Sequence, residues 1–234
     1  MNIQPSIIFE DDYLVALDKP SGLVVNRSIT HSGVTLQDFV EEQIEMEDET
    51  EITDFTSRSG ILHRLDKDTS GVILMAKDPE TFKDILQQFK DRQVKKEYKA
   101  VLMGQIPDPI IDIDAAIKRN PKFPFKFAIS PDGRTSQTHI EKVEEFSKAD
   151  RIYTSVTVRP KTGRTHQIRV HCAALNHPIA CDEIYCTRRE FADSSEYFPR
   201  LMLHALSIEL RHPKTGGNLL LKSTLPNDFT PYFK

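Results

Sequence analysis

The segment HRLDKDTSGVILMA, residues 63–76, joins a charged stretch directly to an apolar one. Its second half, residues 72–76, is continuously apolar, as is typical of a strand that is covered on both faces. Asp66 follows Leu65 close to this strand, so its carboxylate should be partly removed from water. A carboxylate in such a place needs a cationic partner or becomes neutral. The segment therefore predicts a buried strand, preceded by a loop that holds a cation, forms a structural turn or carries chemistry.

Calcium is the first of these alternatives. Asp66, Asp68 and Ser70 have the spacing of the first EF-hand ligands, and Gly71 follows them. The twelfth position of that loop needs a bidentate Glu, and this chain has Lys77 there. The pattern thus excludes an EF-hand, and no other cluster of suitable spacing predicts a metal site.

For Asp68, a turn stabilised by short polar side chains is the better interpretation. Asp66 has two interpretations, a structural ion pair or an ionised nucleophile beside an arginine. Arg64 points away from Asp66 if the backbone is extended. Its partner is therefore expected from residues 162–169, which contain Arg164 and Arg169. The residues alone leave both interpretations open.

Around this segment the hydrophobic pattern alternates between strands and a few helices. Helices are predicted after Thr35, after Asp78 and over residues 166–175. Strands are predicted at residues 6–10, 13–17, 72–76, 97–103, 136–143, 153–158, 201–210 and 219–222. This mixture indicates the α+β class, as a single domain over residues 1–234 with a large mixed, mostly antiparallel sheet flanked by helices and loops. An acidic segment at 41–59 is expected to be exposed.

Composition limits the compartment and the cofactors. The 234 residues contain no apolar run long enough to cross a bilayer and no secretory signal, which predicts a cytoplasmic protein without a membrane partner. Three cysteines without CxxC spacing predict reduced thiols rather than zinc or disulfides. Neither a dinucleotide fingerprint nor a GxxxxGK[ST] phosphate loop is present, so no cofactor is expected.

The charge distribution is uneven although the net charge is −4. Nine acids lie between Asp38 and Asp54 without a single Lys or Arg, while basic clusters occur at 90–99, 118–126 and 159–169. A phosphate-binding face and an ordinary solvated surface explain these clusters equally well. Phe123 and Phe125 alternate with lysines and can stack on RNA bases, but packing at an edge or in the core is the preferred interpretation.

Four or five short motifs, in seven segments, occur in one order along the chain. They are residues 13–22 (YLVALDKPSG), 63–71 (HRLDKDTSG), 96–98 (KEY), 162–171 (TGRTHQIRVH), 176–179 (NHPI), 203–205 (LHA) and 212–213 (HP). The set resembles the RluA-type family of RNA pseudouridine synthases over nearly the whole chain, and residues 63–71 are its most specific part. Where that family usually has His, Gly and Gly, this chain has Asn26, Cys181 and Cys186.

The resemblance implies a role for each matching residue. Asp66 would be the catalytic carboxylate, Tyr98 would stack on the target base and take part in proton removal, and Arg169, rather than Arg164, would pair with Asp66. Arg64 would enter the RNA stack in place of the flipped uridine. The remaining implied contacts are His63 and Arg164 with RNA and Leu203 with the base. From the residues alone, Tyr98 fits a buried strand face and Arg164 a plain surface position equally well.

The implied activity is that of an isomerase without cofactor or metal. Uridine becomes pseudouridine when its N1–C1′ bond breaks, the base turns and C5 joins C1′, by one of three routes that the sequence leaves open. The base must first leave the stack, at a cost of a few kcal/mol. The expected partner is structured tRNA or rRNA, bound by a monomer without a separate N-terminal RNA-binding domain. The alternatives are a non-catalytic RNA-binding or folding factor that retains the scaffold, and a hydrolase of the N-glycosidic bond.

Overall fold

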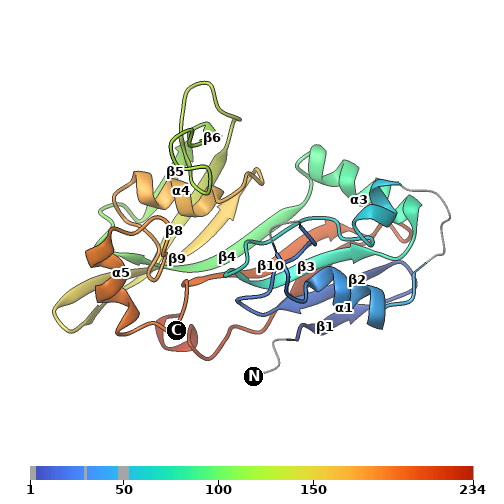
Figure 1. The fold of residues 1–234 in the computed structure, drawn as a ribbon, viewed down its shortest axis with the longest axis horizontal. Coiled ribbons are helices and arrows are strands. Elements are labelled where there is room, and N and C mark those ends of the chain that lie inside the picture. Colours follow the sequence, from blue (N-terminus) through green and yellow to red (C-terminus); the bar gives the residue numbers. More distant parts are fainter. Residues whose placement is uncertain (1–3, 29–30, 47–52, 234) are drawn as a thin grey trace. The chain divides into compact units, whose positions relative to one another are not determined.

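The computed structural model describes residues 4–28, 31–46 and 53–233. The chain forms two compact units (Figure 1). The N-terminal unit comprises 1–95 and 205–224, and the central unit comprises 96–204 and 225–234. No helix in the described ranges is long and apolar enough to span a membrane. The expectation of a single domain over residues 1–234 stays a prediction.

The N-terminal unit contains antiparallel strands. Its sheet has the order β1 (Ser6–Glu10), β2 (Leu14–Lys19), β3 (Ser70–Ala76) and the part of β10 (Leu203–Arg211) that belongs to this unit. β11 (Asn218–Lys222) pairs with β10 as an antiparallel hairpin, built from the strands predicted at 201–210 and 219–222. Every residue of β3 is buried, which confirms the strand covered on both faces that the apolar run predicts.

Two helices bury opposite faces of the β2–β3 pair, because successive side chains of a strand alternate between faces. Leu14 packs in the cluster that contains Phe82 of α3 (Pro79–Lys90). Val15 belongs instead to the cluster with Leu36 of α1 (Leu36–Gln43). Both helices begin at the predicted residues, where Thr35 and Asp78 accept backbone N–H bonds as N-caps.

The acidic segment at 41–59 is only partly as expected. α2 (Asp54–Ser57) interrupts it, and Ile44, Phe55 and Ser59 are buried, so the expectation of exposure is wrong for these three residues. Phe55 contributes its ring to the α3 side of the core, 5.7 Å from Phe82. Residues 47–52 lie outside the described residues.

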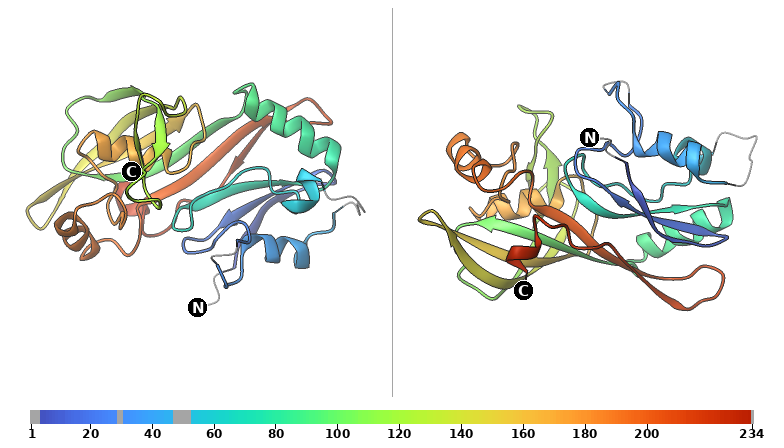
Figure 2. Two further views of the ribbon diagram at one scale, coloured as in Figure 1. Left: turned by 45° about the horizontal axis from the view of Figure 1, so that its top comes forward. Right: turned by 90° about the horizontal axis from the view of Figure 1, so that it is seen from below.

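The central unit is a second antiparallel arrangement (Figure 2). Its strands follow the order β4 (Lys95–Met103), β9 (Arg151–Pro160), β8 (Gln137–Lys148) and β5 (Ile110–Asp114). β6 (Ile117–Arg119) and β7 (Phe127–Ile129) form a separate hairpin, which the sequence pattern does not predict. Its helices are α4 (Gln167–Ala174), α5 (Arg188–Ser195) and the 3-10 turn η1 (Thr230–Tyr232). The α+β, mostly antiparallel class is thus confirmed.

α4 places the motif at 162–171 within this unit. It contacts β7, β8 and β9, and its residues Ile168 and Cys172 belong to the core cluster of the unit. The helix ends near Asn176, whose φ of 62° is the left-handed conformation that often terminates a helix. The side chains that precede and begin α4 are therefore held against the sheet.

Candidate functional site

The loop that carries Asp66 is irregular up to a turn at Lys67–Asp68, and β3 begins at Ser70. Thr69 N–H donates to the Asp66 carbonyl over 3.1 Å and closes this turn. Leu65 is buried, Asp66 is half-buried and Arg64 is exposed. The predicted turn at Asp68 and the predicted partial desolvation of Asp66 are both confirmed. Because Arg64 faces solvent, it is accessible to a large partner.

A buried lysine holds this turn from a distant part of the sequence. The Lys19 side chain is fully buried, and its Nζ donates 2.9 Å bonds to the carbonyls of Pro20, Leu23 and Lys67. Gly22 N–H also donates to the Lys67 carbonyl over 2.9 Å. A lysine ammonium has three N–H donors, and these three carbonyls replace the water molecules that Lys19 loses when it is buried. The turn that follows Lys19 therefore also positions the loop after Asp66.

The far end of the turn depends on Gly71. It has a φ of 114°, and a Cβ built there would lie 2.1 Å from the Ala205 carbonyl oxygen. Only glycine fits such a conformation and such close contact. The start of β3 is thus pressed against β10, which sets where Asp66 stands relative to the sheet of its unit.

His63 binds the neighbouring strand. Its Nε2 accepts the backbone N–H of Leu74 over 3.1 Å, so in the neutral ring the proton is on Nδ1. The ring lies 5.4 Å from that of Phe89 on α3. His63 therefore fixes the beginning of the loop, and its predicted contact with RNA stays a prediction.

In the central unit, the motif residues of β4 point to one strand face. Tyr98 is half-buried, packs on the core cluster and pairs in register with Val158. Two residues earlier, Lys96 Nζ donates to the Thr162 carbonyl over 2.9 Å, and burial lowers the pKa of Lys96 to about 8. β4 thus brings Tyr98 beside the strand that leads into the 162–171 motif.

Gln167 organises that motif. Its Oε1 accepts the Thr162 hydroxyl over 2.7 Å and Arg164 N–H over 3.0 Å. Its Nε2 donates to the Gln137 carbonyl and the Thr138 hydroxyl at 2.9 and 3.0 Å. This buried amide uses both its oxygen and its nitrogen, so the loop around the half-buried Arg164 is held in one conformation.

Arg169 makes a bidentate ion pair with Asp182. Its Nε and Nη2 donate to the two carboxylate oxygens over 2.7 and 2.8 Å, and both residues are buried. Asp182 also accepts the backbone N–H groups of Ile184 and Tyr185. Such pairs fix the guanidinium plane as well as neutralising the charge. Asp66 and Arg169 belong to different units, and their pairing stays a prediction.

The sequence reasoning missed Asp182 and Tyr185. The Tyr185 ring lies 5.3 Å from the Arg169 guanidinium, and its hydroxyl bonds to His166 Nδ1 over 2.9 Å. The signal for Asp182 was the one used for Asp66, an acid next to an apolar run, here residues 179–181. No local pattern indicated which arginine it would meet.

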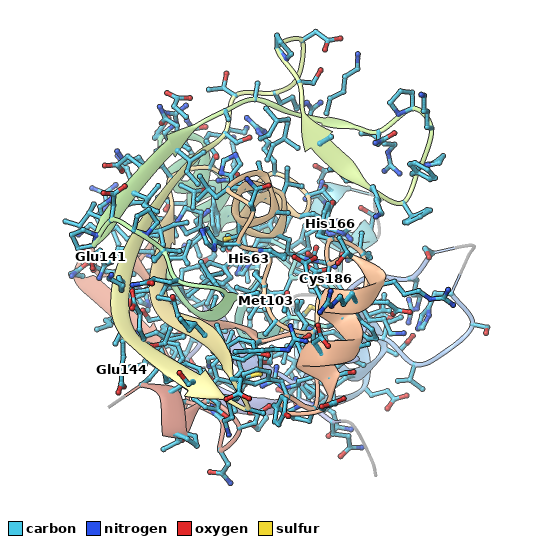
Figure 3. All side chains as sticks on the ribbon, turned by 90° about the vertical axis from the view of Figure 1, so that its left-hand side faces the viewer. His63, Met103, Glu141, Glu144, His166 and Cys186 are labelled. Atoms are coloured by element: carbon cyan, nitrogen blue, oxygen red, sulfur yellow. The ribbon has the colours of Figure 1, made fainter. Side chains whose placement is uncertain are left out.

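The remaining motif residues are packed. Leu203 is buried in the core cluster of the central unit. Cys181 has a φ of 57°, in the left-handed region that favours glycine. This conformation explains why the RluA-type family usually has Gly at this position. The Cys186 thiol lies 3.8 Å from the Met103 thioether (Figure 3), and burial raises its pKa to about 12. All three cysteines are free thiols.

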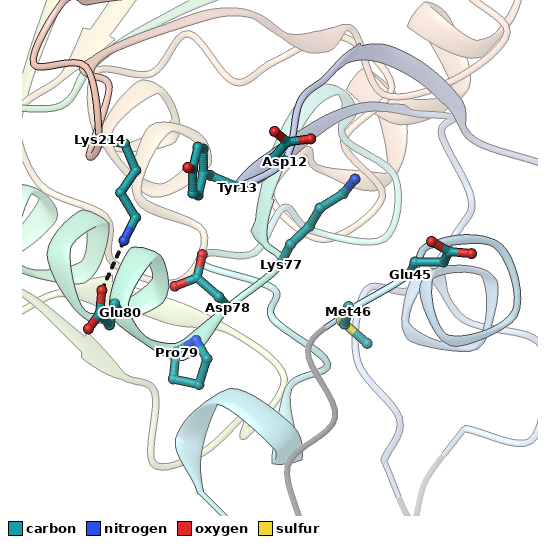
Figure 4. Close-up of a pocket in the computed structure, with 9 residues that line it drawn as sticks. All are labelled: Asp12, Tyr13, Glu45, Met46, Lys77, Asp78, Pro79, Glu80 and Lys214. Carbon is teal, nitrogen blue, oxygen red and sulfur yellow. Dashed lines mark hydrogen bonds and ion pairs between the residues drawn. The ribbon is translucent and has the colours of Figure 1, made fainter.

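Within the part of the chain that the structure describes, no group of three or more His, Cys, Asp or Glu side chains is arranged to hold a metal ion. A pocket of about 660 Å³ lies elsewhere in the N-terminal unit (Figure 4). It is lined by Tyr13 before β2 and Lys77 after β3, at the strand ends opposite to Lys19 and Ser70. It is therefore separate from the Asp66 loop.

Comparisons with known proteins agree on one family. A family model described as RNA pseudouridylate synthase matches residues 13–174. The ribosomal large subunit pseudouridine synthase D of Nitrosomonas europaea is 36% identical over 226 residues, which cover 95% of this chain and 62% of that protein. The ribosomal large subunit pseudouridine synthase C of Buchnera aphidicola subsp. Baizongia pistaciae is 33% identical, with 97% and 69% covered. This chain thus spans less than two thirds of the Nitrosomonas protein.

A solved structure supports the same grouping. The human RNA pseudouridylate synthase domain containing 1 matches with a TM-score of 0.75 and 26% identity, over 96% of this chain and 84% of that one.

Proposed function

The chain belongs to the RNA pseudouridylate synthase family, and on this premise we propose that it converts uridine into pseudouridine in ribosomal RNA. The observation that carries the proposal is the Asp66 loop. A half-buried carboxylate follows an exposed arginine, on a turn that a buried lysine holds in place. A solvated surface loop would need no such restraint. A group that must meet one atom of a substrate does need it, because small misplacements cost large factors in rate.

In the proposed reaction, Asp66 acts in its ionised form beside the ribose of the target nucleotide. The N1–C1′ bond breaks, the base turns, and C5 bonds to C1′. C5 then loses its proton and N1 gains one, so the product is an isomer of the substrate. Tyr98 would stack on the base and take part in removing the C5 proton, and Leu203 would line the base pocket. Asp66 can act by attack at C1′, by attack at C6 or by an elimination through a glycal, and the proposal leaves these three routes open.

Two arginines have separate proposed tasks. Arg169 would face the Asp66 carboxylate and keep it ionised. Its bidentate bond to Asp182 supports this task, because it presents the guanidinium in a fixed plane. The exposed Arg64 side chain would fill the gap that the flipped uridine leaves in the base stack. This contact would offset part of the few kcal/mol that base flipping costs. His63 and Arg164 would add contacts to the RNA.

The names of the relatives favour large-subunit rRNA over tRNA as the substrate. The Nitrosomonas protein is a synthase D and the Buchnera protein a synthase C, at similar identity to this chain. Their names therefore leave the modified uridine open. We further propose that the protein acts in the cytoplasm as a monomer, without cofactor or metal.

The test compares Asp66→Asn with Asp68→Asn on large-subunit rRNA and tRNA transcripts. Pseudouridine is mapped at single positions, and RNA binding is measured in parallel. The proposal expects conversion by the wild type and by Asp68→Asn, and no conversion by Asp66→Asn, which still binds RNA. Free uracil and abasic RNA would instead support the hydrolase. A deletion phenotype that Asp66→Asn rescues fully would support the non-catalytic factor.

A further inference from the structure

The β6–β7 hairpin of the central unit (Figure 1) has its tip at residues 120–126, and this tip carries two exposed aromatic side chains. Phe123 is 51% exposed and Phe125 58% exposed. The two rings contact each other edge-on, with centroids 6.1 Å apart. The expectation that they pack at an edge or in the core is therefore wrong. Two adjacent exposed phenylalanines cost solvation free energy unless a partner covers them.

The tip is held rigidly although it is exposed. Asn120 Oδ1 accepts the N–H groups of Lys122 and Phe123 at 2.9 and 3.2 Å. Lys126 N–H donates to the Phe123 carbonyl over 2.8 Å, and Lys126 O accepts Asn120 N–H over 2.9 Å. Pro121 and Pro124 restrict the remaining backbone torsions. The backbone that carries the rings is thus held in one conformation, which lowers the entropy cost of binding.

The base of the hairpin is anchored to residues of the candidate site. Phe127 N–H donates to the Tyr185 hydroxyl over 2.9 Å, and the Phe127 ring lies 5.5 Å from that of His166. The ring of the same Tyr185 makes a cation–π contact with the Arg169 guanidinium. Tyr185 therefore contacts both the base of the hairpin and the proposed catalytic arginine, Arg169, whose guanidinium is also bonded to Asp182.

The charge of the hairpin indicates the kind of partner. Residues 117–129 include four cations and no acid. Lys118 bonds to Asp132 outside the hairpin, and the Arg119 guanidinium lies 4.9 Å from the Phe127 ring. Lys122 and Lys126 flank the two exposed rings and are themselves exposed or half-buried. Aromatic faces between cations fit unpaired nucleotides, which stack on the rings while their phosphates meet the lysines.

We propose that Phe123 and Phe125 form a stacking platform for an unpaired base of the substrate RNA, and that Lys122 and Lys126 contact the adjacent phosphates. This inference rests on the proposed function, because it takes RNA as the substrate. It adds a specificity element, since a platform for bases requires a single-stranded segment beside the target uridine.

The first experiment measures binding by fluorescence anisotropy, using a labelled single-stranded RNA oligonucleotide and a duplex of the same length. Phe123→Ala/Phe125→Ala should raise Kd for the single strand about ten-fold or more. Phe123→Tyr/Phe125→Tyr should restore binding, because the ring faces return. Leu220→Ala is the matched control, since Leu220 is 60% exposed on β11, which belongs to the N-terminal unit and not to the hairpin. Affinity for the duplex should stay unchanged in the two Phe double variants and in Leu220→Ala.

A salt series separates stacking from charge. Lys122→Gln and Lys126→Gln should each reduce the slope of log Kd against log salt by about 0.7, whereas the double alanine variant should leave the slope unchanged. An unchanged Kd for the double alanine variant, or equal weakening of single strand and duplex, overturns the platform. Loss of a protein partner with no change in RNA affinity also overturns it.

Turnover of the wild type on rRNA is measured alongside. If the wild type forms no pseudouridine, the proposed function fails, while the oligonucleotide series still tests the hairpin. If turnover is normal and neither KM nor Kd responds to the double alanine variant, the hairpin inference alone fails.

Discussion

The Asp66 loop and the hairpin tip are both charged, irregular segments, yet they are held in opposite ways. The turn after Asp66 is bonded to Lys19, 48 residues earlier, and the start of β3 is pressed against β10. The hairpin tip is held by its own residues, mainly Asn120. A loop supported by the core can keep a catalytic group in one place. A loop supported locally can expose apolar rings without disturbing the core.

The largest expected effect is at Gly71. Gly71→Ala should destabilise the protein by about 3 to 5 kcal/mol, because the new Cβ meets the Ala205 carbonyl and φ is positive. Gly216→Ala is the control, with φ of 71° and no atom within 4 Å of its Cβ. It should cost only about 1 to 2 kcal/mol. Urea unfolding measures both, and equal losses would show that close contact with β10 is unimportant.

Lys19 tests the long-range support directly. Lys19→Met should cost roughly 3 kcal/mol, because three carbonyls lose their charged donor, and should slow pseudouridine formation. Lys122→Met at the hairpin tip is the matched change and should alter stability by less than about 0.5 kcal/mol. Urea unfolding and turnover on rRNA check both variants. Unaltered unfolding in Lys19→Met would remove the distinction between the two segments.

Burial at His204 predicts a pH effect that the exposed hairpin cannot produce. Burial lowers the pKa of His204 to about 4 in the folded protein. Between that value and about 6.5 the unfolded chain binds more protons, so stability falls as the pH falls through this window, by on the order of 3 kcal/mol. His204→Gln should remove this dependence, as measured by urea unfolding at pH 4.5 and 7.

His139 is the control with the opposite sign. Its hydrogen bonds to Asp112 and Glu141 raise the pKa of His139, so its contribution is present at low pH and is lost as the pH rises through the folded pKa. His139→Gln should therefore lower stability at acidic pH. A pH profile that His204→Gln leaves unchanged would contradict the role assigned to burial.

The smallest expected effect is at the hairpin itself. Phe123→Ala/Phe125→Ala should change the free energy of unfolding by less than about 0.5 kcal/mol, since both rings already face solvent. The same variant is the one that should weaken RNA binding most. Thermal unfolding monitored by circular dichroism measures the stability. A loss of several kcal/mol would mean that the rings serve folding instead.

Short-range patterns in the sequence were sufficient for the regular elements and for the turn beside Asp66. Thr35 and Asp78 mark the starts of α1 and α3 because an N-cap bonds to a residue three positions on. The apolar run at 72–76 specified a strand buried on both faces. The ordered motifs pointed to the family that the comparisons confirm. Each of these depends on residues that are neighbours in the chain.

Tertiary structure decided the pairings between distant residues. Nothing near Lys19 indicates that its ammonium meets the Lys67 carbonyl, and nothing near Arg169 selects Asp182 as a partner. The exposure of Phe123 and Phe125 was likewise mispredicted, because a hydrophobic side chain is buried only if another element comes to cover it. Local bonds follow from sequence spacing, whereas long-range contacts and burial follow from how the packed elements meet.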